Sequence, residues 1–119
     1  MRLSILIAAA ALLTSTAAAA SADGDYRITG AGAIACSQIT ADIAADPAAA
    51  PEIAAWLMGY STATNRQTAD TWDLMGEGGI EAYYTAVQAD CAANPDKMLE
   101  SAAFDVLNAN YETRTLSKP

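Results

Sequence analysis

The chain has 119 residues, with 14 acidic against six basic side chains and no histidine, and its formal net charge is −8 at pH 7. This acidic balance disfavours nucleic acid and anionic membrane surfaces as partners. Without histidine the chain lacks the usual general base, the usual partner of a nucleophilic Ser or Cys and the commonest zinc ligand. The sequence therefore predicts neither an enzyme nor a metal site, and it indicates no cofactor.

Residues 1–22 have the pattern of a secretory signal peptide. Arg2 gives a positively charged start, an apolar run covers 3–20, and Ala20-Ser21-Ala22 places small residues at a cleavage site. The second half of the run is mostly Ala, Ser and Thr, which disfavours an uncleaved membrane anchor. We expect cleavage before Asp23, which leaves a mature chain with five basic and 14 acidic side chains, a net charge of −9.

Two cysteines, Cys36 and Cys91, are present in the chain. In an oxidising compartment two thiols usually form one disulfide. A metal or redox site is disfavoured because neither cysteine has a second thiol at Cys-x-x-Cys spacing. A bridge that closes so long a loop would stabilise the fold by about 4 kcal/mol in the chain-entropy model.

The mature chain is predicted to begin with an extended lead-in over 23–32, which contains three glycines. A first helix is expected over 33–45, because Cys36, Ile39 and Ile43 recur three and four residues apart. An Asp-Pro pair directly after this segment ends the helix.

A second helix is expected from about Pro51 to a point between Thr64 and Thr68. Its apolar stripe consists of Ile53, Trp56, Leu57 and Tyr60. Gly59 within this pattern predicts the close approach of another helix. Because consecutive helical residues are about 100° apart, the stretch 56–60 presents large apolar groups on more than one side. One side serves the core, and the stripe is our candidate surface for binding a client or partner protein.

After a loop over 68–79, the spacing of Ile80, Tyr84, Val87 and Cys91 predicts a third helix over 80–93. Asn94-Pro95-Asp96 has the pattern of a helix start, so a fourth helix is expected from there to about residue 109. Its predicted buried side consists of Leu99, Ala103, Val106 and Leu107. These elements give an all-α, four-helix domain over 33–110, followed by a polar, flexible tail over 111–119.

The chain resembles the HdeA/HdeB family of periplasmic acid-stress proteins, and HdeB-like members in particular. The resemblance rests on the leader, on Cys36 near the first helix, on Ala54-Ala55-Trp56-Leu57-Met58 after a proline, and on the segment from Cys91 through Asn94-Pro95 to Leu99. It implies bridged cysteines, an all-helical fold, a periplasmic location and a homodimer that binds unfolding proteins in acid without ATP.

The same segments also look somewhat like the Tai-type immunity proteins, which neutralise secreted toxins. Two functions therefore follow from the sequence. The first is an acid-responsive chaperone whose partners are unfolding periplasmic proteins. The second is a module that binds one specific protein partner at neutral pH.

Overall fold

The computed structural model describes residues 21–119, which form four α-helices and two short 3-10 helices, without strands. The helices are α1 (Cys36–Ala45), α2 (Ala49–Gln67), α3 (Gly79–Ala93) and α4 (Leu99–Ala109), with η1 (Gly30–Ala33) before α1 and η2 (Tyr111–Thr113) after α4. The predicted four-helix, all-α fold closed by one disulfide is confirmed. Apart from its last two residues, the predicted signal peptide lies outside the described residues.

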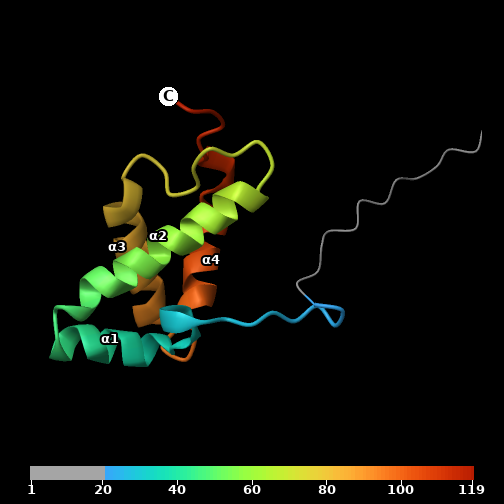
Figure 1. The fold of residues 1–119 in the computed structure, drawn as a ribbon. Coiled ribbons are helices and arrows are strands. Elements are labelled where there is room, and N and C mark those ends of the chain that lie inside the picture. The colour runs from blue at the N-terminus through green and yellow to red at the C-terminus, as the bar shows by residue number, and fades with distance from the viewer. Residues whose placement is uncertain (1–20) are drawn as a thin grey trace, which may run out of the picture.

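The long helix α2 crosses α3 and α4, and α1 lies across one end of the bundle (Figure 1). All four helices contribute to one buried core, made of Cys36, Ile39, Ile53, Leu57, Leu74, Tyr83, Val87, Cys91, Leu99, Ala102, Ala103 and Leu107. Within residues 21–119, no helix combines the length and apolar composition needed to cross a bilayer.

Helix α1 begins at Cys36, three residues after the predicted start. Ala35 is extended and forms an isolated bridge with Met98, which prevents the helix from beginning earlier. The preceding residues form the separate turn η1 within and just after the predicted lead-in. Helix α2 begins at Ala49, so that Pro51 falls in its first turn as expected.

The predicted start of the fourth helix at Asn94-Pro95-Asp96 is wrong, because α4 begins only at Leu99. Asn94 instead ends α3, where its backbone N–H donates to the Asp90 carbonyl oxygen at 2.9 Å. The residues that follow form a turn whose carbonyl groups accept hydrogen bonds from the start of α1. Tertiary pairing thus outweighs a favourable local capping pattern.

Two further expectations about packing differ from the structure. An ideal Cβ at Gly59 would have no heavy atom within 4 Å, so no helix approaches this glycine closely and that prediction is wrong. On α3 the most buried aromatic side chain is Tyr83, at 1% exposure, whereas Tyr84 and Ile80 are only partly buried. The Tyr83 hydroxyl donates to the Ala103 carbonyl oxygen at 3.2 Å, which satisfies it inside the core.

The end of the chain is connected to the loop between α2 and α3. The Trp72 N–H donates to the Thr115 carbonyl oxygen at 2.7 Å, and the Thr115 N–H donates to the Asp73 carbonyl oxygen at 2.9 Å. The Arg114 guanidinium lies 4.0 Å from the centre of the Tyr111 ring, and its Nε donates to Thr71 Oγ1 at 3.0 Å. These contacts hold the first part of the predicted tail against the loop.

Candidate functional site

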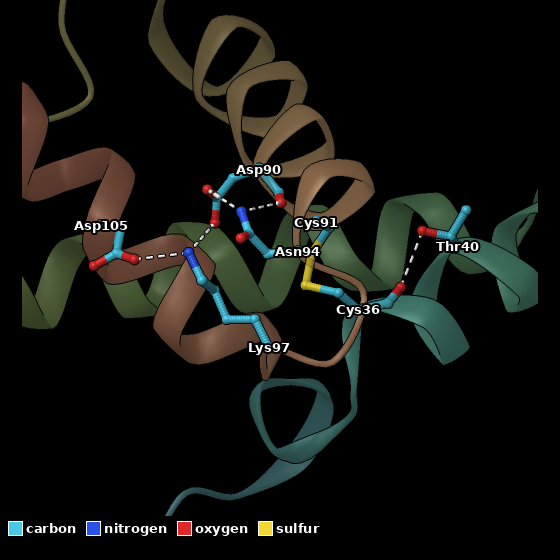
Figure 2. Close-up of a disulfide and its surroundings, with 7 residues drawn as sticks. All are labelled: Cys36, Thr40, Asp90, Cys91, Asn94, Lys97 and Asp105. Atoms are coloured by element: carbon cyan, nitrogen blue, oxygen red, sulfur yellow. Dashed lines mark hydrogen bonds and ion pairs between the residues drawn. A yellow bond between two sulfur atoms is a disulfide. The ribbon is translucent and has the colours of Figure 1, made fainter.

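The disulfide joins the first residue of α1 to the last turn of α3. Cys36 and Cys91 are both buried, and their Cα atoms are 4.8 Å apart. The Cys36 N–H also donates to the Lys97 carbonyl oxygen at 2.8 Å, and the Leu99 N–H donates to the Ile34 carbonyl oxygen at 3.0 Å. The disulfide (Figure 2) and these backbone hydrogen bonds therefore fix the same corner of the molecule.

Lys97 connects this corner to two helices through carboxylates. Its Nζ lies 2.8 Å from Asp105 Oδ2 on α4 and 2.7 Å from Asp90 Oδ2 on α3 (Figure 2). These hydrogen bonds, to Asp105 first and then to Asp90, raise the pKa of Lys97 above its ordinary value. Each ion pair depends on the negative charge of its own aspartate, because a neutral carboxyl group does not attract the ammonium.

The four residues predicted to bind a client or partner all lie on α2, but the structure divides them. Ile53 and Leu57 are in the core, at 8% and 0% exposure. Trp56 and Tyr60 are partly buried beside the core, and their rings stack with centroids 5.1 Å apart and planes inclined by 17°. We call this set of four the α2 face. In the folded protein it is mostly covered.

The cover over Trp56 is the glycine-containing turn η1. An ideal Cβ on Gly32 would lie 2.0 Å from Trp56 Cζ2, so the indole occupies space that only a glycine leaves free. Gly30, which has a positive φ of 66°, also faces the indole. The Trp56 Nε1–H donates to the Thr29 carbonyl oxygen at 3.1 Å, which ties the lead-in to α2.

A buried carboxylate connects the lead-in to α2 a second time. Glu100, on α4, is 5% exposed, and its Oε1 accepts hydrogen bonds from Tyr60 Oη at 2.6 Å and from Tyr26 Oη at 3.2 Å. Burial, together with the hydrogen bond to Glu100 and its negative charge, raises the pKa of Tyr60. The charge of Glu100, with smaller contributions from burial and the hydrogen bond, raises the pKa of Tyr26. Both hydroxyl groups therefore remain donors.

Sequence reasoning missed Glu100 and Tyr26. A signal for Glu100 was present, since it lies three residues before Ala103 and seven before Leu107, on the predicted buried side of the helix. Tyr26 had no such signal, because it lies in an aperiodic segment and is itself 61% exposed. Only the folded arrangement brings its hydroxyl to the carboxylate.

A pocket with a volume of about 370 Å³ opens beside these side chains. We call it the Glu100 pocket; its lining is made of Tyr26, Arg27, Ile28, Thr29, Ala55, Trp56, Gly59, Tyr60 and Glu100. Elsewhere in residues 21–119, no group of three or more Cys, Asp or Glu side chains gathers in an arrangement that would hold a metal ion.

The fold and these contacts define a small helical domain, closed by one disulfide, whose aromatic α2 face is covered by its own lead-in. The chain belongs to the HdeA/HdeB family of periplasmic acid-stress chaperones, because the model of that family matches residues 2–101. Members of the family are chaperones rather than enzymes, and they bind unfolding client proteins. Searches of curated proteins and of solved structures found no match. The family match favours the chaperone over the immunity function.

Proposed function

We propose that this chain is exported to the periplasm by a cleaved leader over residues 1–22 and there binds unfolding proteins at low pH, without ATP, through the α2 face. The observation that carries the proposal is the cover over Trp56 and Tyr60. Two hydrogen bonds join the lead-in to the helices there, one from Tyr26 Oη to the Glu100 carboxylate and one from the Trp56 indole to the Thr29 carbonyl oxygen. A face that is covered at neutral pH and uncovered in acid would bind clients only under stress.

Acid acts on the carboxylates, since the chain has no histidine. Carboxylic acids take up protons around pH 4. A protonated Glu100 is a weaker acceptor for the Tyr26 and Tyr60 hydroxyl groups, because charge-assisted hydrogen bonds are about twice as strong as neutral ones. In the same pH range the net charge of the mature chain changes from −9 towards about +5, and the resulting repulsion favours opening.

The proposed organisation of the mature protein follows from these roles. Residues 23–32 are the lead-in that covers the α2 face, 33–110 are the helical domain, and 111–119 are a tail whose first part contacts the loop between α2 and α3. We further propose that two copies associate at neutral pH and separate in acid. Large apolar side chains that are about half exposed, among them Phe104 and Met98, provide surface for this contact. Sedimentation velocity at pH 7 and pH 3 measures the association.

The chaperone proposal is tested by aggregation of periplasmic extract at pH 2 to 4, with and without the purified mature protein. We expect suppression in acid and none at pH 7. Trp56→Ala removes an aromatic group from the α2 face, and Trp72→Ala is its matched control, because Trp72 lies on the loop after α2 and is 49% exposed.

Trp56→Ala should reduce protection in acid, and Trp72→Ala should retain it. Equal aggregation with and without the wild-type protein would show that the chain does not protect clients under these conditions. Equal protection by both variants would remove the α2 face from the mechanism. Mass measurement of the periplasmic protein tests cleavage before Asp23 independently of either result.

A further inference from the structure

Glu100 is the one buried acidic residue in the described part of the chain. Its Oε1 accepts both tyrosine hydroxyl groups, but the nearest donor to Oε2 is Ser101 Oγ, at 3.5 Å. Among residues 21–119 the ion pairs all involve Lys97, so none reaches Glu100. Burying a carboxylate without a positive partner is costly, and one oxygen retains most of its capacity to accept.

The Glu100 pocket places aromatic rings around this carboxylate. Trp56 and Tyr60 line it as a stacked pair, and Tyr26 lines it from the lead-in. Gly59 contributes no side chain to the lining, and there is open space where its Cβ would lie. A volume of about 370 Å³ is near the lower end of the range for small-molecule sites.

We propose that the Glu100 pocket of the folded protein binds an alkylammonium group at neutral pH, with the cation against the aromatic rings and its charge neutralised by Glu100. Aromatic rings attract cations through their negative faces, and the attraction is larger where water is excluded. The buried carboxylate supplies the opposite charge that an uncharged apolar ligand would leave unpaired. This binding goes beyond client capture in acid and does not depend on it.

Arg27 provides a second test, because its removal should have the opposite effect on ligand binding from the removal of the Glu100 charge. It lines the same pocket, and it forms no hydrogen bond or ion pair with Glu100. A guanidinium at this position repels a second cation, so its removal should strengthen the binding of an ammonium group and weaken the binding of an anion. Glu100 and Arg27 therefore have opposite predicted effects on one ligand.

The alkylammonium group has two sources, a free small amine or a lysine side chain of another protein. The first probe is choline, compared with its uncharged carbon analogue, in which a tert-butyl group replaces the trimethylammonium group. The second is a capped Gly-Lys-Gly tripeptide, compared with the same peptide carrying 2-aminoheptanoic acid in place of lysine, in which a methyl group replaces the ammonium group. Each pair is matched in shape and differs in charge.

Binding is measured at pH 7 and constant ionic strength by the fluorescence of Trp56 in a Trp72→Phe chain, which has a single tryptophan. We expect a saturable change with a charged probe and none with its neutral match. Tighter binding of choline assigns the site to a free amine, and tighter binding of the peptide assigns it to a protein side chain. No saturable change with either charged probe, or equal changes with the neutral ones, would overturn the proposal.

Two variants test the assignment of charge. Glu100→Gln should weaken binding of the charged probe by about tenfold or more, the usual effect of losing a charged partner. Arg27→Gln should bind it more tightly than the parent chain. Thermal melting shows that each variant is folded, and a folded Glu100→Gln chain that binds as tightly as the parent would contradict the proposal. Because these measurements are made at neutral pH, they can fail while acid protection of clients persists.

Discussion

Gly32→Ala tests whether the lead-in turn holds the α2 face in place. The new Cβ would lie 2.0, 2.5 and 2.9 Å from three atoms of the Trp56 indole, distances that no packed pair of carbon atoms tolerates. The indole or the turn must therefore move. Because the Trp56 Nε1–H donates to the carbonyl oxygen of Thr29, directly before this turn, a displacement of the ring also breaks that hydrogen bond.

The cost of this substitution follows from three contributions. Overpacking a well-packed site costs about 1 to 3 kcal/mol. Loss of the indole hydrogen bond costs about 0.5 to 1.5 kcal/mol. Replacing glycine stabilises by about 0.4 to 1 kcal/mol, because alanine has less freedom in the unfolded chain. We expect a net decrease of about 2 kcal/mol in the free energy of unfolding.

The assay is urea unfolding at pH 7, followed by circular dichroism and by Trp56 fluorescence in a Trp72→Phe background. Gly59→Ala is the matched control, since its Cβ would meet no atom within 4 Å in the middle of α2. There alanine should stabilise the protein by up to about 1 kcal/mol through helix propensity. If Gly32→Ala unfolds at the same urea concentration as the parent, or at a higher one, the turn does not constrain Trp56 as described.

Three further predictions concern the core. Replacing Cys36 and Cys91 together with alanine should lower the free energy of unfolding by about 2 to 5 kcal/mol, and an unchanged urea midpoint would contradict a structural role for the bridge. Ser61→Ala should raise the free energy of unfolding by about 1 kcal/mol, because the Ser61 hydroxyl is buried without a hydrogen-bond partner. A lower melting temperature would show that the hydroxyl does form a hydrogen bond. Burial raises the pKa of Tyr60 and Tyr83 above the ordinary 10.0, so the folded state keeps protons that the unfolded state loses. Stability is therefore expected to fall as pH rises above 10. Part of the tyrosinate absorbance should therefore appear only when the chain unfolds. Complete titration of all the tyrosines in a chain that is still folded would contradict this prediction.

The sequence was sufficient to predict the helices and the disulfide. Apolar residues three and four apart marked α1, α2 and α3, and the structure places Cys36 and Cys91 on the inner faces of the first and third of these. This pattern predicts helices because a helix buries one side, so its apolar residues recur every three to four positions in the sequence. Two cysteines permit only one pairing within the chain.

The start of α4 and the role of Gly59 could not be predicted in the same way. Asn94-Pro95-Asp96 is locally a good helix start, but the chain uses this turn to receive hydrogen bonds from α1, a pairing between residues about 60 positions apart. A glycine within a helical pattern marks a position without a side chain, but the sequence does not show what lies opposite that position. At Gly59 that is open space beside the Glu100 pocket.

The candidate site was predicted only in part for a related reason. Periodicity identified the apolar stripe of α2, but it does not distinguish Leu57, which is fully buried, from Trp56, which lies under the lead-in. That difference depends on the path of residues 26–32, a segment without periodicity. Contacts from such a segment are set by the positions of single glycine, tyrosine and carbonyl groups, which a sequence pattern does not reveal.

The contacts of the folded protein divide into those that acid changes and those that it does not. At the corner between α1 and α3, the disulfide and the backbone hydrogen bonds of Cys36 and Leu99 contain no titratable group. The Lys97 ion pairs at this corner are different. The hydrogen bonds to Asp105 and Asp90 raise the pKa of Lys97, so they stabilise the folded state fully at pH values below the ordinary lysine pKa. This contribution is lost as the pH rises through the pKa of Lys97 in the folded state.

In acid the disulfide at this corner remains, because it contains no titratable group. The contacts over the α2 face, in contrast, include an ionisable group, because Tyr26 of the lead-in donates to the Glu100 carboxylate while the Trp56 indole donates to the Thr29 carbonyl oxygen. Protonation of Glu100 weakens this cover without affecting the bridge between α1 and α3. The proposed mechanism therefore requires no separate sensor: the same acidification that unfolds clients loosens the cover, while the disulfide limits how far the chain can expand.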